Sequence, residues 1–261
     1  MVKFKLGVVD GTGDWSDADY AAQMEHSFCR QIFDAVGEPA AKYLRGPSMD
    51  GLSVRTKAYE IADWVSDARP DRVYLAGYSR GASAVIYAAE LLQERGITVD
   101  VMFLFDAVAR HVWSTLGGTT VPSNVMLTLH AARDQNAAMV RQYEGTINGG
   151  LGNPIRIWFG NTALKGLGPR FHYRTFSGSH GALGGVGWKH VKEDPACQQA
   201  VAAFMTPELQ RALGVQIRSY PPTNEGSTGR TAAYVGALDR FAMDPKTPLK
   251  AVYDAAKTKL R

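Results

Sequence analysis

The feature that most constrains the fold is the regular alternation of short apolar runs with longer amphipathic stretches along the 261 residues. Apolar runs of strand length, with a weaker one near Tyr43, occur at residues 3–9, 72–76, 99–105, 125–130 and 171–176. This alternation predicts an α/β protein with a mostly parallel sheet and helices on both faces. A chain of this length can bury about three-quarters of its unfolded surface, so we expect one domain over residues 1–261.

Capping and breaking residues mark the ends of the expected helices. Ser16 or Asp17 can cap the first helix, while Gly37 and Gly96 can end the first and the third. The amphipathic spacing predicts helices over residues 16–36, 53–68, 82–95, 133–143, 195–213 and 248–260.

Two stretches interrupt the alternation. Residues 144–170 are rich in glycine and carry an apolar cluster around Trp158, which fits either a lid over a site or a surface loop held by its aromatic side chains. Residues 215–231 contain Pro221 and Pro222 and indicate a linker, so residues 215–261 are expected to form a linker and a C-terminal helix.

Charge and hydropathy exclude several classes of protein. The chain has 29 Lys and Arg against 25 Asp and Glu, and residues 214–261 alone hold eight basic against four acidic residues. This small excess is unlike the basic stripe of a nucleic-acid binder, but it permits peripheral contact with an anionic membrane. The sequence has neither a signal-peptide pattern nor an apolar run of membrane-spanning length, so we expect a cytoplasmic product, exported only by a signal-independent system. It does not determine an oligomeric state.

The two cysteines do not predict a metal site. Cys29 and Cys197 lie far apart in helical stretches without metal-ligand spacing, which favours two buried thiols in a reducing compartment. We therefore expect neither a metal nor a cofactor.

The pattern with the clearest chemical meaning is Gly77-Tyr78-Ser79-Arg80-Gly81. It follows the strand predicted at residues 72–76 and precedes the helix predicted at residues 82–95. This strand–turn–helix context predicts a nucleophile elbow that presents Ser79 at the carboxyl edge of the sheet. The alternative is a glycine-bounded turn in which Ser79 only caps the helix.

A serine nucleophile needs a histidine base, and in this kind of fold the histidine comes last in the chain. His180 lies in a glycine-rich segment just after the final predicted strand, where a loop can bring its imidazole to Ser79. His172 and His190 are the alternatives. His130 lies at the end of the preceding predicted strand.

The acid that orients the histidine can come from either of two strand ends. Asp106 directly follows an apolar strand, and a carboxylate in that place is hard to explain as part of a core. Asp134 follows the next predicted strand, where it can also serve as a helix cap or first-turn charge. We expect Asp106 to be the acid and keep Asp134 as the alternative.

The oxyanion formed during acyl transfer needs backbone N–H donors near Ser79. The amide of Arg80 is one candidate, and the loop of residues 10–14 offers those of Gly11 and Thr12. Rival interpretations of this loop do not fit: a dinucleotide fingerprint requires Gly or Ala at Ser16, and a phosphatase of the haloacid dehalogenase type requires Asp at Val8.

Five segments together resemble a bacterial α/β-hydrolase family that includes the type VI secretion phospholipase effectors. They are Val9-Asp-Gly-Thr-Gly13, Gly77-Tyr-Ser-Arg-Gly-Ala82, Leu104-Phe-Asp-Ala-Val108, His130-Ala-Ala-Arg-Asp134 and Gly178-Ser-His-Gly-Ala-Leu-Gly-Gly185. The resemblance implies an α/β-hydrolase fold with Ser79 as nucleophile, Asp106 as acid and His180 as base. Two of the segments differ from the family pattern: the family usually has Ser-Asp where this chain has Gly181-Ala182, and Asp-Glu where it has Asp134-Gln135.

The residues and the resemblance together predict a serine hydrolase that acts on carboxylic esters, with lipid or phospholipid acyl esters as the expected substrates. A thioesterase or peptidase with the same three residues is the alternative within enzymes. A hydrolase-fold binding module without activity is the alternative outside them.

Overall fold

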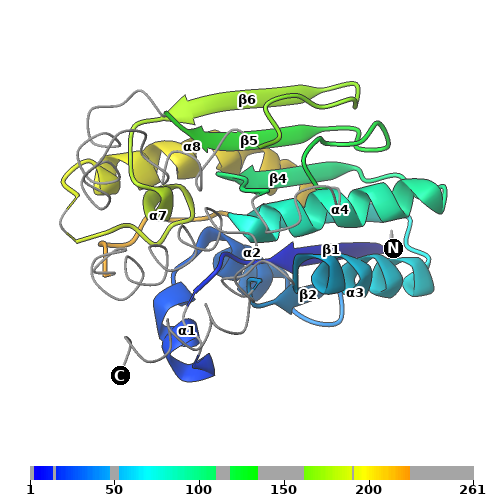
Figure 1. Ribbon diagram of the computed structural model, residues 1–261, viewed down its shortest axis with the longest axis horizontal. Helices are drawn as coiled ribbons and strands as arrows, with labels where there is room; N and C mark the ends of the chain where they lie inside the picture. Colours follow the sequence, from blue (N-terminus) through cyan, green and yellow to red (C-terminus); the bar gives the residue numbers. More distant parts are fainter. Residues whose placement is uncertain are drawn as a thin grey trace, which may run out of the picture.

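The computed structural model describes residues 3–13, 16–47, 53–109, 118–134, 162–189 and 191–223. Within these ranges the strands form one six-stranded sheet in the order β2-β1-β3-β4-β5-β6, and every neighbouring pair is parallel (Figure 1). The strands are β1 (Phe4–Val9), β2 (Ala41–Leu44), β3 (Arg72–Tyr78), β4 (Val101–Phe105), β5 (Thr128–Arg133) and β6 (Phe171–Phe176). The expected parallel sheet is therefore confirmed.

Helices cover both faces of this sheet. They are α1 (Asp17–Met24), α2 (Phe28–Val36), α3 (Ser53–Ala68), α4 (Arg80–Glu94), α7 (His180–Leu183) and α8 (Asp194–Leu213). Strand β4 shows why both faces must be covered: Met102 and Leu104 enter the core shared with α3 and α4, while Phe103 and Phe105 enter the core shared with α2 and α8. All four side chains are fully buried, as in a strand that lies between two helical layers.

The helix expected over residues 16–36 is wrong as a continuous element, because it is two helices separated near Ser27. The Ser27 hydroxyl accepts a hydrogen bond from the amide of Arg30 at 2.9 Å and so caps α2. The same hydroxyl donates to the buried carboxylate of Asp10. Because Ser27 takes an extended backbone conformation to do both, α1 cannot run on into α2.

The strand expected at residues 125–130 lies three residues further on. Its register is set by pairing with β4 and β6, in which Met102 lies opposite Thr128 and Arg133 opposite Phe176. Val125 makes only an isolated bridge to Val99. The helix expected from residue 133 is therefore wrong at its start, because Arg133 is the last residue of β5.

Several expectations concern residues outside the described ranges: the remainder of the 133–143 helix, the lid with Trp158, His190, the second half of the 215–231 linker and the terminal helix at 248–260. Of the 144–170 stretch, the structure describes residues 162–170. Across the described parts of the chain, no helix has both the length and the apolar character needed to cross a lipid bilayer.

Candidate active site

Ser79 occupies the turn between β3 and α4 in a backbone conformation that non-glycine residues seldom adopt. Its φ is 57° and its ψ is −127°. Such a conformation costs about 1–3 kcal/mol and persists only where the surroundings enforce it. Here the Ser79 amide donates to the carbonyl of Phe105 at 3.0 Å, and the Ser79 carbonyl accepts from Val108 and Ala82. The turn is therefore held at the ends of both β3 and β4.

The two glycines of the elbow allow the backbone segments to approach each other. A Cβ atom on Gly77 would lie 2.6 Å from the Cα of Ala82, and one on Gly81 would lie 2.2 Å from the carbonyl oxygen of Asp10. Neither contact is sterically possible without moving the backbone. The glycines of the G-x-S-x-G pattern are thus required by close packing of α4 against β3 and the end of β1.

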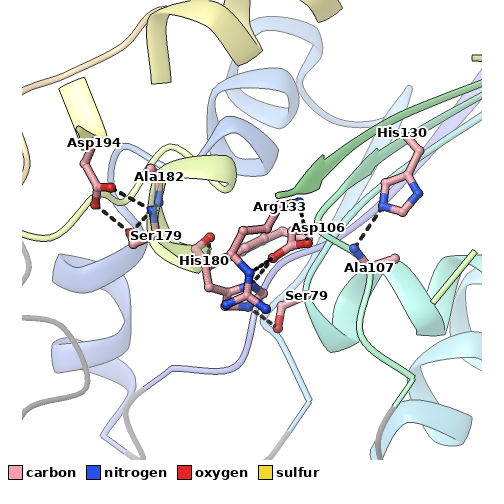
Figure 2. A network of polar contacts seen from close by, with 10 residues as sticks. Ser79, Asp106, Ala107, His130, Arg133, Ser179, His180, Ala182 and Asp194 are labelled. Carbon is pink, nitrogen blue, oxygen red and sulfur yellow. Dashed lines mark hydrogen bonds and ion pairs between the residues drawn. The ribbon is translucent and has the colours of Figure 1, made fainter. Parts of the chain in front are cut away.

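The structure brings the three predicted residues Ser79, His180 and Asp106 into one hydrogen-bonded line (Figure 2). The Nε2 atom of His180 lies 2.8 Å from the hydroxyl oxygen of Ser79. Its Nδ1 atom lies 2.6 Å from Oδ2 of Asp106. All three side chains are nearly completely buried. They come from the carboxyl ends of β3 and β4 and from α7, which lies beyond the arrowheads of β4 and β5 in Figure 1.

The Asp106 carboxylate is held in its ionised form. Burial by itself raises the pKa of Asp106, but hydrogen bonding to His180 and the nearby Arg133 guanidinium outweigh it and lower the pKa to about 2. The second carboxylate oxygen accepts the Arg133 amide at 3.0 Å. The Asp106 amide in turn donates to the carbonyl of Ala131 at 2.7 Å, which ties the residue to β5.

His180 is held in its neutral form. Burial lowers the pKa of its imidazole, and the positive charges of Arg133 and Arg80 act in the same direction against the attraction of Asp106. Because the ionised Asp106 can only accept, the proton of the neutral ring lies on Nδ1. Nε2 then carries the lone pair that accepts the hydroxyl proton of Ser79, which is the arrangement required of a general base.

The alternative site residues lie elsewhere. Asp134 follows β5, where its amide donates to the carbonyl of Phe176 at 2.8 Å. His172 is exposed on the edge strand β6. His130 is buried within β5, and its Nε2 accepts the amide of Ala107 at 3.2 Å (Figure 2). Its Nδ1 donates to the carbonyl of Ala163 at 3.0 Å. Both ring nitrogens of His130 are therefore hydrogen-bonded to backbone groups.

The candidate oxyanion donors differ in their bonding. Arg80 begins α4, and its guanidinium reaches the hydroxyl of Thr12 at 3.5 Å. The amide of Gly11 already donates to the carboxylate of Asp10 at 2.7 Å. Because this amide already has an acceptor, Gly11 is not available as an oxyanion donor. The amides of Arg80 and Thr12 remain as the candidate donors.

Sequence reasoning missed the role of Asp10, which is fully buried at the end of β1. Its carboxylate also accepts from the hydroxyls of Ser27 and, at 2.9 Å, Tyr43. Burial raises the pKa of Asp10 to about 6, although these hydrogen bonds lower it in part. The signal was present in the sequence, because Asp10 follows an apolar strand just as Asp106 does.

Sequence reasoning also missed Tyr78, the residue before the nucleophile. Its ring lies 5.0 Å from the His180 ring, and its hydroxyl donates to the His180 carbonyl at 3.1 Å. Cβ atoms on Gly11 and Gly184 would come within 2.5 Å of this ring. Tyr78 therefore packs between the loop after β1 and the segment after α7, a contact that no local pattern reveals.

The cysteines agree with expectation. Cys29 and Cys197 are buried free thiols whose pKa burial raises, so neither is poised as a nucleophile. Among the described residues, no three side chains of His, Cys, Asp or Glu converge in a way that could hold a metal ion.

The sheet, the elbow and the site together identify the fold of this protein as the α/β-hydrolase fold. The defining features are a parallel sheet, a strained serine between a strand and a helix, and Ser79, Asp106 and His180 delivered in that chain order.

Comparisons with known proteins give only distant structural similarities. No family profile and no curated protein sequence matches this chain. The RedJ thioesterase of prodiginine biosynthesis in Streptomyces coelicolor is 15% identical over 70% of this chain and 85% of its own, with a TM-score of 0.36. YbtT, a type II thioesterase of the yersiniabactin pathway, is 15% identical over 82% of this chain and 94% of its own, with a TM-score of 0.39. An uncharacterised Pseudomonas aeruginosa protein is 13% identical over 98% of this chain and 52% of its own, with a TM-score of 0.43.

Proposed function

We propose that this chain is a serine hydrolase that cleaves carboxylic esters through an acyl-enzyme. The observation that carries the proposal is the line of hydrogen bonds from Asp106 through His180 to Ser79. Each member is in the state that nucleophilic catalysis requires: the serine in a strained elbow, the histidine neutral and the carboxylate ionised.

The first half of the reaction transfers the acyl group to the enzyme. The Ser79 oxygen attacks the carbonyl carbon while its proton passes to Nε2 of His180. The π electrons of the carbonyl group move to its oxygen, and the amides of Arg80 and Thr12 are the proposed donors to this oxyanion. Collapse of the intermediate breaks the bond to the alcohol, which leaves with the proton held by His180.

The second half releases the acid. A water molecule gives one proton to Nε2 of His180 as its oxygen attacks the acyl carbon. The second intermediate collapses, the carboxylic acid departs, and the Ser79 oxygen recovers its proton from His180. Asp106 remains ionised throughout and stabilises the imidazolium that forms in each half.

The proposed substrates are lipid or phospholipid acyl esters, on the basis of the resemblance of the five sequence segments to the family with the secretion phospholipases. Fatty acid release from anionic phospholipid vesicles, measured beside hydrolysis of a short-chain nitrophenyl ester, tests this substrate class together with the peripheral membrane contact that the charge balance permits. Acyl thioesters and peptides in the same panel test the alternative substrates. Turnover of thioesters alone would replace the lipid proposal while leaving the mechanism intact.

Labelling by a fluorophosphonate tests the activity itself, because only an activated serine reacts with this reagent. We expect the wild-type protein to be labelled at Ser79, and Ser79→Ala to fold normally, escape labelling and lose about 10⁶ in kcat on the nitrophenyl ester. Ser83→Ala is a matched control, since Ser83 lies one turn along α4 and its hydroxyl donates to the Gly118 carbonyl at 2.9 Å.

The control should retain both labelling and turnover. Activity of Ser79→Ala above about a hundredth of wild type would reject the proposal. A wild-type protein that neither labels nor cleaves any ester, thioester or peptide would instead support a binding module.

A further inference from the structure

We propose that Asp194 is a positioning residue that fixes the segment carrying His180 and thereby sets the distances from its imidazole to Ser79 and Asp106. The inference rests on the proposed hydrolase function. Asp194 lies in the first turn of α8, fourteen positions after His180, and its carboxylate accepts hydrogen bonds from Ser179 and Trp188.

Three donors from the histidine segment converge on the Asp194 carboxylate. Oδ1 accepts the amide of Ser179 at 2.8 Å, and Oδ2 accepts the hydroxyl of Ser179 at 2.5 Å and the amide of Trp188 at 2.7 Å. The bonds therefore hold the segment on both sides of α7. Since Ser179 directly precedes His180, movement of this anchor would displace the imidazole.

Ser179 connects the Asp194 carboxylate to α7. Its hydroxyl oxygen accepts the amide of Ala182 at 3.1 Å, so Ser179 is the N-cap of the short helix that His180 begins (Figure 2). When the hydroxyl proton is donated to Asp194, the oxygen lone pairs face the helix amide. The carboxylate thus orients the cap, and the cap orients the first turn that carries the imidazole.

The Asp194 carboxylate accepts hydrogen bonds from the histidine segment instead of from the amides of its own helix, α8. An acidic side chain in the first turn of a helix commonly bonds to that helix's free amides, but the Asp194 bonds run to Ser179 and Trp188. Asp194 is fully buried, and burial raises the pKa of its carboxyl, so its ionised form depends on these three donors.

The surroundings leave little room for another arrangement. A Cβ atom on Gly178 would lie 2.3 Å from the Cys197 sulfur, and one on Gly181 would lie 2.7 Å from the Trp188 indole nitrogen. The histidine segment is therefore pressed against α8 and against itself. Close packing fixes where the segment lies, and the Asp194 bonds fix its rotation.

Asp194→Asn tests the proposal with little change of shape. The asparagine NH2 group replaces an acceptor with a donor, so at least one donor of the segment loses its partner. Misplacement of a reacting group by about 1 Å costs about 10²-fold in rate. We expect kcat on the nitrophenyl ester to fall about 10²-fold, KM to change less than about twofold, and fluorophosphonate labelling of Ser79 to slow in proportion to kcat. The far-downfield proton resonance of the His180–Asp106 hydrogen bond should broaden or disappear.

Gln198→Met is the matched control. Gln198 is also fully buried on α8, one turn later, and it accepts the Gly187 amide at 3.0 Å and donates to the Tyr220 carbonyl at 2.8 Å. Its loss should lower the melting temperature without the fall in kcat or the change in the proton spectrum. Ser179→Ala keeps the Trp188 bond and removes the cap, so it should fold and lose about tenfold in kcat.

The proposal would be overturned by an Asp194→Asn protein with kcat within threefold of wild type, or by Gln198→Met causing the same loss at equal stability. If Asp194→Asn does not fold, wild-type kcat in Ser179→Ala overturns it. Ser79→Ala distinguishes failure of this inference from failure of the proposed hydrolase function. If the hydrolase proposal is wrong, Ser79→Ala retains the measured activity.

Discussion

At the scale of single residues, the site depends on two strained positions that support each other. Ser79 and Asp106 are non-glycine residues with positive φ, 57° and 41°. The Ser79 amide donates to the carbonyl before Asp106, and the Asp106 amide donates to Ala131 of the next strand. Adjacent strand ends thus hold both turns, which keeps the side chains at separations that His180 can bridge.

Asp106→Asn should show that this carboxylate orients the histidine. The amide of asparagine can donate to Nδ1 and hold the wrong tautomer, so we expect kcat to fall about 10⁴-fold while the fold is retained. Asp134→Asn is the comparison and should cost far less, because it leaves the hydrogen bond between Asp106 and His180 in place. Steady-state kinetics of both variants on one ester decides the matter, and a large defect in Asp134→Asn with a mild one in Asp106→Asn would reverse the assignment.

At the scale of elements, the site depends on how closely α4 approaches the end of β1. Gly81 packs against the end of β1. A Cβ atom on Gly81 would lie 2.3 Å from the carbonyl oxygen of Val9 and 2.2 Å from that of Asp10. The loop that follows β1 carries Thr12, a proposed oxyanion donor, and α4 begins with Arg80, the other. The gap between these two elements therefore sets the separation of the two proposed donors.

Gly81→Ala should widen this gap. Since the new methyl group meets backbone that cannot rotate away, we expect a loss of about 1–3 kcal/mol in the free energy of unfolding and a clear fall in kcat. Gly37→Ala is a suitable control, because Gly37 has φ 71° with no atom near its Cβ position. It should cost about 1–3 kcal/mol through backbone strain, because φ 71° with ψ 168° is a conformation that essentially only glycine adopts, and it should leave kcat unchanged. Denaturant unfolding and ester kinetics measure both effects, and an unchanged kcat in Gly81→Ala would contradict the argument.

At the scale of the whole molecule, two buried carboxylates lie at the ends of the strands that flank β3, with opposite shifts in pKa. Asp106 follows β4 and its pKa is lowered to about 2, with His180 and Arg133 outweighing the effect of burial. Asp10 follows β1 and its pKa is raised by burial to about 6, since the hydrogen bonds that it accepts from two hydroxyls and an amide offset the effect of burial only in part. The sheet thus places one carboxylate beside a base and the other in a neutral network.

Asp10 should make the stability of the protein depend on pH near neutrality. Its pKa is about 6 when folded and 3.8 as an ordinary value, so the folded state binds the proton more tightly. The ionised form therefore costs stability above pH 6, and this cost disappears as the pH falls toward 4. Relative to Asp10→Asn, which does not titrate, the wild type should gain about 2 kcal/mol between pH 7.5 and 4.5.

The free energy of unfolding of Asp10→Asn is subtracted from that of the wild type at each pH. This subtraction removes the opposing contribution of His130 and His180, whose lowered pKa values destabilise the fold in acid. Denaturant unfolding at a series of pH values measures this difference. A difference that stays constant, or that shrinks in acid, would show that Asp10 does not titrate in this range.

Local patterns were sufficient for the parallel sheet and for the elbow at Ser79, because apolar period and glycine spacing are properties of short segments. They were also sufficient to favour Asp106 and His180, which the structure places on either side of one hydrogen bond. Local patterns failed where a residue distant in the chain determines the boundary of a helix or strand. The break before α2 depends on Ser27 reaching Asp10, and the start of β5 depends on its register with β4.

The sequence by itself determined the class of fold and the position of the strained serine, since both follow from residues close together in the chain. Only the tertiary structure decided between Asp106 and Asp134 as the acid, because both follow strands and the deciding hydrogen bond joins Asp106 to an imidazole 74 residues away in the chain. It also decided the surroundings of Asp10, which like Asp106 follows a strand that flanks β3 but accepts hydrogen bonds from the hydroxyls of Ser27 and Tyr43. Such pairing depends on distances in space, which become defined only when the helices and strands have packed.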